Sequence, residues 1–421
     1  MVCRRVFAFA ALLAMLSCAA SAASGQSDFG GSTGYVPAHI RAQLVSQTVD
    51  WGEADSSDAL VSPNFPRTPR LWAKADYLLW WTKGVKAPPL ATTSPAGTPV
   101  GMAGVLGQPG TTVLFGGEHL HDDTQPGARF AIGGWIDADR HMGVELNYLF
   151  LDEDVDLFHA TSSQVAVLGR PFFNNSPGMN TQDATLSAFP GTTGGMLQAG
   201  ATTRFQTLEF MFRKLAFQTE TFSIDSVFGY RYAELQDRVR IDSTSIVLSG
   251  VGAGARLVQY DDFATRNTFH GGVLGVLIDW NPTPVWSTHF VGKAGLGETR
   301  ARTSIYGQSV STTAGGVSTQ TVGGLYAQGT NIGAYNQNDF GVFSELGMTL
   351  RRQMVFGWSA SLGYTFLYWT DVARAGEKID PAINATQIPP GTLVGPSQPA
   401  FPFNESGYWA QGLLFGLDCE F

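Results

Sequence analysis

The sequence predicts an all-β fold: a transmembrane antiparallel β-barrel of ten strands over residues 71–421. Three observations support this prediction. An export signal opens the chain, ten later segments alternate apolar and polar side chains, and the connections between these segments are alternately long and short. A barrel that crosses an outer membrane, with short periplasmic turns and long extracellular loops, accounts for all three.

The first 22 residues have the three parts of a secretory signal peptide. Arg4 and Arg5 supply the positive region, residues 6–16 are apolar, and residues 20–22 read Ala-Ser-Ala, a cleavage site. A second interpretation makes Cys18 the lipid acceptor of a lipoprotein. We exclude this segment from the fold, and both interpretations predict that the chain is exported.

Residues 23–70 are rich in Ser, Gly, Asp and Pro, and their hydrophobic residues have no sustained period. A segment of this kind cannot bury enough apolar surface to offset the entropy of ordering it. We therefore interpret residues 23–70 as a largely disordered periplasmic linker, followed by an outer-membrane barrel over residues 71–421.

Ten segments after the linker alternate with a period of two, which is the period of a β-strand with two unlike faces. In the clearest one, 356–369, aromatic and aliphatic residues at even positions oppose Gly, Ser and Thr at most odd positions. An apolar, aromatic face suits lipid, and a small or polar face suits a lumen. The ten predicted strands are 71–81, 129–137, 142–150, 203–213, 222–234, 267–280, 285–298, 340–351, 356–369 and 408–421.

The connections between these segments alternate in length, which soluble β-sandwiches give no reason to do. Long connections span about 83–128, 152–202, 236–265, 300–338 and 371–407, and short ones span about 138–141, 214–221, 281–284 and 352–355. An even strand number places both chain ends in the periplasm. Twelve strands remain an alternative if a loop such as 302–310 pairs.

The last segment ends on Phe421, although chain termini are usually polar and frayed. We expect Phe421 to close the barrel against the first strand, in the membrane interface. A final aromatic residue also resembles the C-terminal signal that the barrel-assembly machinery reads. The expected partners are therefore outer-membrane lipid and, through the C-terminal strand, this machinery.

The net charge and the sequence motifs argue against several classes of function. The net charge is −9, and it becomes −11 when Arg4 and Arg5 are removed. Without a Lys/Arg cluster, an acidic chain is a poor nucleic-acid binder. The glycine-rich stretch GVLGQPGTTVLFGG (104–117) has neither the Lys nor the following helix of a phosphate loop. We expect no cofactor and no enzymatic activity.

Ionisable residues fall on the predicted lumen face of nearly every strand. A ten-stranded barrel is only slightly wider than one whose interior side chains fill it, so these charges should pair. The pairs would form either a structural salt-bridge core or the lining of a narrow conduit. The predicted lumen network comprises Lys74, Asp76, Arg129, Glu145, Glu209, Arg231, Asp279, Lys293, Glu345 and Asp418.

Histidines suggest two weaker hypotheses. His119 and His121 are two residues apart in an acidic stretch, so they could share a face and bind a metal with a carboxylate; a solvated loop is the simpler interpretation. Omptin-type proteases are ten-stranded barrels with Asp and His near the outer rim. Asp154, Asp156, His159 and His270 invite that comparison, but no ordered motif supports it.

Six parts of the chain carry a resemblance to known sequences: 75–84 with 88–95, 104–117, 261–275, 323–347, 363–380 and 408–421. They resemble a family of bacterial outer-membrane barrels of unknown function, beta-barrel protein seven. The resemblance implies an outer-membrane location and supplies no functional residues. Two departures are Ser344 and Ala375, where the family pattern has Pro.

Two functions remain open on this basis. The first is a structural or narrow-channel, porin-like barrel that displays large surface loops. The alternative is a surface binding or adhesion protein that acts through its extracellular loops, since such loops commonly carry function on a rigid scaffold. The sequence names no solute and no extracellular ligand.

Overall fold

The computed structural model describes residues 70–121 and 123–421. The predicted signal peptide and all but the last residue of the predicted linker lie outside this part. No helix within it has the length and apolarity needed to span a membrane.

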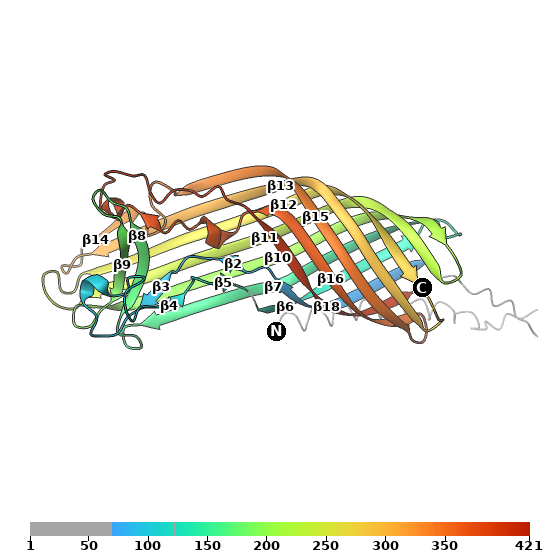
Figure 1. The fold of residues 1–421 in the computed structure, drawn as a ribbon, viewed down its shortest axis with the longest axis horizontal. Helices are drawn as coiled ribbons and strands as arrows, with labels where there is room; N and C mark the ends of the chain where they lie inside the picture. Colours follow the sequence, from blue (N-terminus) through green and yellow to red (C-terminus); the bar gives the residue numbers. More distant parts are fainter. Residues whose placement is uncertain (1–69, 122) are drawn as a thin grey trace, which may run out of the picture.

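Ten antiparallel strands form a closed ring, as predicted (Figure 1). Consecutive strands of the ring are hydrogen-bonded neighbours, and β18 pairs with β1 to close it. All ten predicted segments are found as strands. The strands are β1 (Leu71–Thr82), β6 (Thr124–Trp135), β7 (Met142–Thr161), β10 (Thr193–Gln218), β11 (Phe222–Val247), β12 (Arg256–Trp280), β13 (Trp286–Thr312), β15 (Gly333–Gln353), β16 (Trp358–Val372) and β18 (Ser406–Glu420).

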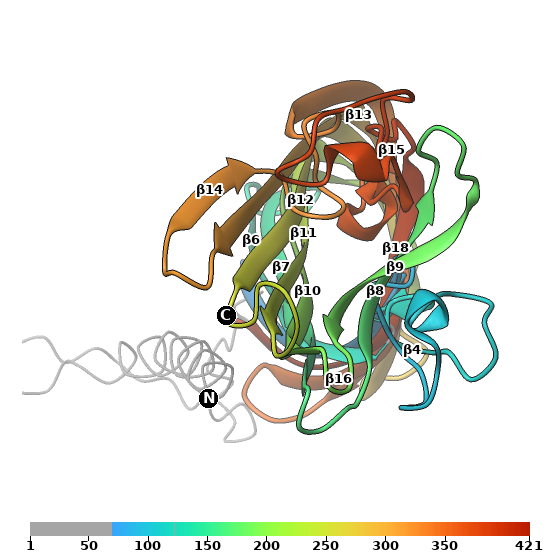
Figure 2. The ribbon, with the colours of Figure 1, turned by 90° about the vertical axis from the view of Figure 1, so that its left-hand side faces the viewer.

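Shorter elements gather at the end of the barrel that carries the long connections (Figures 1 and 2). β17, β8, β3, β4 and β9 form one small sheet, and β2 pairs with β5. These elements are β2 (Val85–Lys86), β3 (Ala91–Thr93), β4 (Thr112–Phe115), β5 (His119–Leu120), β8 (Leu168–Asn174), β9 (Thr181–Ala188), β14 (Ser318–Val322) and β17 (Ala382–Ile383), with 3₁₀ helices η1 (Val100–Met102), η2 (Ala375–Lys378) and η3 (Ala385–Gln387).

The alternative of twelve barrel strands is wrong. Residues 302–310 belong to β13 itself. β14 pairs with the outer end of β13 and has no other neighbour among the described strands, so it extends the barrel outward without widening the ring.

The long connections are shorter than predicted, because several strands run on beyond the predicted ends. β11 and β12 leave only residues 248–255 between them, not 236–265. The reason is that the apolar and polar faces of a strand exchange sides along its length. In the half of β11 near the short turns, which we call the lower half, the apolar residues face outward. In the half near the long connections, Val239 and Ile241 point inward and Arg238 and Arg240 point outward.

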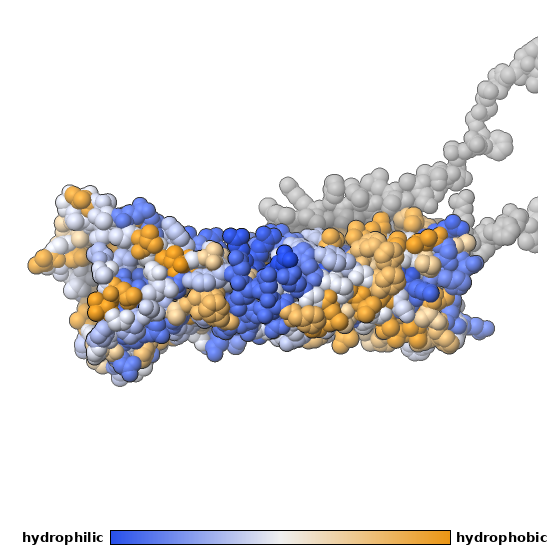
Figure 3. Space-filling view, turned by 90° about the horizontal axis from the view of Figure 1, so that it is seen from above, coloured by the Kyte–Doolittle hydropathy of each residue, from blue (hydrophilic) through white to orange (hydrophobic). Residues whose placement is uncertain are grey.

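This exchange of faces marks the boundary between the part of the barrel that contacts lipid and the part that contacts water. Exposed apolar side chains form a zone toward the end with the short turns, and a hydrophilic zone borders it (Figure 3). Outward residues of the apolar zone include Leu146, Phe210, Phe228, Leu274 and Leu346. The barrel therefore has a lipid-facing half and an extracellular half in which inward hydrophobic residues, such as Val239 and Ile241, form a second core.

The last residue of the chain takes part in the closure of the ring by β1 and β18. The Phe421 N–H donates to the Leu71 carbonyl (2.9 Å), and the Phe421 carbonyl accepts from the N–H groups of Leu71 (2.9 Å) and Arg70 (3.1 Å). Phe421 thus extends the β1–β18 pairing by one residue.

We expect Phe421→Asp to impair assembly, because a charge on the lipid face costs up to a few kcal/mol, less near an interface. Heat-modifiable gel migration and the yield of folded protein in the membrane measure assembly. Phe403→Asp, at an exposed loop position, is the control. Equal folded yields of the two variants would contradict a role for the terminal aromatic residue.

Candidate functional site

The strand alternation brings the predicted lumen charges together in the lower half of the barrel. Lys74 lies 3.5 Å from the Asp76 carboxylate and 3.8 Å from that of Asp418. Arg129 Nε donates to Asp76 (2.8 Å), and its guanidinium lies 3.8 Å from Glu345. These residues form a continuous chain of charges along the lumen wall.

Arg231 joins this chain to the opposite side. Its guanidinium donates to Glu209 on the neighbouring strand β10 and to Glu345 on β15, which is not a neighbour of β11. Lys293 Nζ donates to Glu209 (2.5 Å) and lies 3.8 Å from Glu345. All four side chains are buried, so acidic and basic groups compensate one another across the lumen.

The two remaining predicted residues lie beside this chain. Asp279 pairs with Arg213 (3.1 Å) and with His289 Nδ1 (2.8 Å), and Arg213 also pairs with Asp225. Sequence reasoning missed Asp225 and His289 as partners, although Asp225 has the same parity as Arg231. Glu145 accepts a hydrogen bond from Trp72 Nε1 (3.1 Å).

A cavity of about 400 Å³ lies among these charged residues. Its lining extends from Trp135 and Glu420, near the short turns, to Lys293 and Glu345. The lower lumen is therefore a polar vestibule on the periplasmic side.

Aromatic side chains from separate strands meet directly above the charges; we call this group the aromatic lid, Phe205, Phe269, Phe343, Trp369 and Tyr408. Ring centroids lie 6.5 Å apart for Phe205–Phe343 and 5.3 Å apart for Phe205–Tyr408. β10 neighbours neither β15 nor β18. These contacts therefore cross the lumen and form an apolar layer above the charges.

The lid and the charges are in contact. The Arg231 guanidinium lies 4.6 Å from the centroid of the Phe343 ring. Trp369 Nε1 donates to Thr299 Oγ1 (2.9 Å), so the lid's indole N–H is satisfied.

Above the lid, the long connections fold inward and pack on the barrel wall; we call this packed region the loop core. Apolar residues from the connections, such as Leu168, Tyr326 and Ile383, pack with inward residues of the wall, such as Val239 and Phe263. Figure 2 looks onto this end of the barrel, where the short strands and 3₁₀ helices surround the mouth.

Buried polar contacts fasten the loop core to the wall. Arg170 pairs with Asp261, whose carboxylate also accepts the N–H groups of residues 325–327. Arg374 Nε donates to Asp237 (2.5 Å). Asn267 exchanges two hydrogen bonds of 2.8 Å with the main chain of Ala373. These contacts hold the loops in place.

The histidine hypotheses fare differently from the lumen prediction. His119 is exposed and His121 is buried, so the prediction that they share a metal-binding face is wrong. His121 instead meets Asp154 and Asp156 of β7, at 3.4 and 3.6 Å. His159 and His270 point to the outer surface, and His270 Nδ1 pairs with the Tyr230 hydroxyl (2.7 Å). The four residues of the omptin comparison are not brought together.

Comparison with known proteins gives a family match and weak structural likenesses. A family model described as "Putative beta barrel porin-7" matches residues 72–421. No curated protein matches the chain. Among solved structures, the outer membrane protease OmpT from Escherichia coli is 7% identical, with 84% of this chain and 98% of that chain covered and a TM-score of 0.37.

Two further structures are less similar. The transport unit of the autotransporter AIDA-I from Escherichia coli is 7% identical, with 87% and 94% of the two chains covered and a TM-score of 0.24. A Pseudomonas aeruginosa FadL homologue is 8% identical, with 84% and 90% covered and a TM-score of 0.23. With all three TM-scores below 0.5, these likenesses carry no argument about this chain.

We expect Arg231→Ala to lower the free energy of unfolding by about 3–5 kcal/mol, because it leaves Glu209 and Glu345 with less compensating charge in a buried site. Denaturant titration followed by tryptophan fluorescence measures it. Arg238→Ala on the same strand, which removes an exposed pair with Asp262, should cost less than about 1 kcal/mol. Equal costs would mean that water screens the lumen charges.

Proposed function

Because the chain belongs to the beta barrel porin-7 family of outer-membrane barrels, we propose that it is a closed barrel of low conductance that supports an ordered extracellular surface. The observation that carries this proposal is the contact of aromatic rings across the lumen, from Phe205 to both Phe343 and Tyr408.

The lid opposes ion flow for a physical reason. A hydrated ion that entered from the vestibule would have to pass an apolar layer with few groups to replace its water, and hydrophobic constrictions of this kind gate by dewetting. The charges below the lid are already paired with one another, so they offer few free partners. Both layers favour a closed lumen over a general diffusion pore.

The second candidate function, binding at the cell surface, is favoured by the loop core. The outer ends of β10 to β13 continue past the apolar zone and hold the connections on a buried hydrophobic core. Such a surface is preorganised, which lowers the entropy lost on binding. The ligand's identity is open, and the proposal assigns no catalytic activity to the chain.

Assembly completes the proposal. The chain would be exported by its N-terminal signal and inserted by the barrel-assembly machinery, which would read the strand that ends at Phe421. Lipid would contact the apolar zone of Figure 3.

Planar-bilayer recording tests the proposal. We expect the wild-type conductance to be far below that of a general porin. Combined Phe205→Ala and Phe343→Ala substitutions remove rings from opposite sides of the lid and should increase conductance. Phe210→Ala, which removes an outward ring from the same strand as Phe205, should leave it unchanged. A wild-type conductance typical of a general porin would refute the closed lumen.

A further inference from the structure

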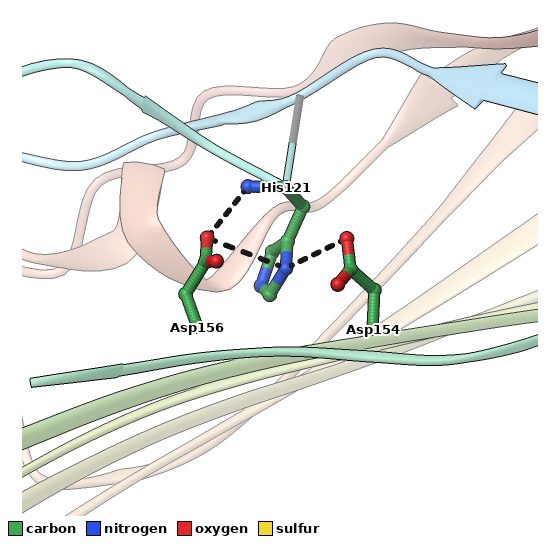
Figure 4. Close-up of side chains that lie close together, drawn as sticks. All are labelled: His121, Asp154 and Asp156. Carbon is green, nitrogen blue, oxygen red and sulfur yellow. Dashed lines mark hydrogen bonds and ion pairs between the residues drawn. The ribbon is translucent and has the colours of Figure 1, made fainter. Parts of the chain in front are cut away.

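We propose that His121, Asp154 and Asp156 bind one divalent transition-metal cation of the zinc class, in the extracellular half of the barrel. The site is separate from the lumen charges and from the aromatic lid, and it does not depend on whether the lumen conducts. Figure 4 shows the three side chains converging from two segments of the chain.

A β-bulge in β7 aims the two carboxylates inward. Leu151 pairs with Phe205 and Asp154 pairs with Thr203, so both Asp152 and Glu153 lie opposite Arg204. One extra residue reverses which positions face inward: odd-numbered residues do so before the bulge, and even-numbered residues after it. Bulges often re-aim side chains next to functional sites. Without this bulge, Asp154 and Asp156 would point to the outer surface.

His121 comes from the connection that follows β1 and rests against the inner wall. Its side chain is only 1% exposed, and its main chain has φ of 61°. A positive φ is uncommon for a residue with a side chain and costs free energy unless the surroundings hold it. The His121 N–H donates to Asp156 Oδ2 (2.8 Å), which fixes this conformation and orients the carboxylate.

The imidazole is buried without a hydrogen bond. Neither ring nitrogen has a hydrogen-bond partner among the described residues, and Asp154 Oδ2 has none either. Buried polar groups are nearly always satisfied, so an unsatisfied ring nitrogen that faces two carboxylates requires an explanation. A bound cation would satisfy these atoms together.

The distances fit a metal site better than an ion pair. His121 Nδ1 lies 3.4 Å from Asp154 Oδ2 and 3.6 Å from Asp156 Oδ2. Charge-assisted hydrogen bonds between nitrogen and carboxylate are about 2.7–2.9 Å long. Tetrahedral zinc with bonds of about 2.0–2.2 Å places its ligand atoms roughly 3.3–3.6 Å apart. The two distances from Nδ1 therefore match the edges of a zinc tetrahedron, and the ligand atoms of all three residues lie within 4.8 Å of one another.

The donor set selects the class of metal. One neutral imidazole and two carboxylates suit zinc and its neighbours, whereas calcium takes 6–8 oxygen ligands. The Asp154 and Asp156 side chains are 20% and 34% exposed, so an ion and a water ligand can approach from the carboxylate side. The ion would tie the connection after β1 to the wall at β7.

A second acidic group with histidine does not have these features. Asp137, Asp139 and His141 lie in the exposed turn between β6 and β7. Asp137 already accepts the N–H groups of His141 (2.9 Å) and Met142 (2.7 Å), so its carboxylate stabilises the turn.

Calorimetric titration of the folded, metal-free protein in detergent with Zn²⁺ tests the proposal. We expect one Zn²⁺ per chain and a higher thermal midpoint when it is bound. His121→Asn, Asp154→Asn and Asp156→Asn should each weaken binding by at least about tenfold and abolish the thermal shift.

Two matched controls separate this site from adventitious binding. His119→Asn removes an exposed imidazole two residues away, and His159→Asn removes an outward imidazole of β7; both should bind like wild type. If His121→Asn fails to fold, Asp154→Asn decides, since it keeps the side-chain shape. The proposal is overturned if wild type binds no stoichiometric Zn²⁺, if the site variants bind like wild type, or if Ca²⁺ binds more tightly than Zn²⁺.

Discussion

Every main-chain polar group of a strand in lipid must be hydrogen-bonded, and a sheet satisfies this requirement only when it closes on itself. The pairing of β18 with β1, which Phe421 extends by one residue, closes the ring, and much of the interior follows from this closure. Ten strands enclose a lumen so narrow that inward side chains from non-neighbouring strands must touch. Charges at one level must then find partners, and aromatic rings at the next level must pack against one another.

The lipid-facing half was predictable because one residue in two had to be apolar on the outside. This alternation is seen where Phe228 and Tyr230 point outward and Gly229 and Arg231 point inward. The extracellular half has the same period with its faces exchanged, as in Arg238 and Arg240 against Val239 and Ile241. A prediction based only on outward apolar residues ends each strand where the faces exchange. The predicted loop 236–265 therefore includes the outer ends of β11 and β12.

The site was predictable only in part, for a similar reason. Parity assigns Arg231 and Glu345 to the lumen, but their contact depends on the stagger of strands that are not neighbours in the ring. At the bulge opposite Arg204, which turns Asp154 inward, the outward apolar residues change from even positions such as Leu146 to odd positions such as Leu157, and an exchange of faces without a bulge would give the same alternation. Side-chain contacts within a loop were likewise beyond prediction: Asn331 accepts the Gln328 N–H (2.8 Å) and donates to the Tyr326 carbonyl (3.0 Å), so it shapes this loop.

The two layers of the lumen make different contributions to the stability of the barrel. The desolvation of paired charges on burial offsets much of their mutual attraction, so the charged layer contributes little to the free energy of unfolding. Burying aromatic rings and the loop core is favourable by itself. Stability therefore rests mainly on the lid and the loop core, while the charges penalise any arrangement that separates Arg231 from Glu209 and Glu345. An opening motion would have to break both layers, because Arg231 packs directly on Phe343.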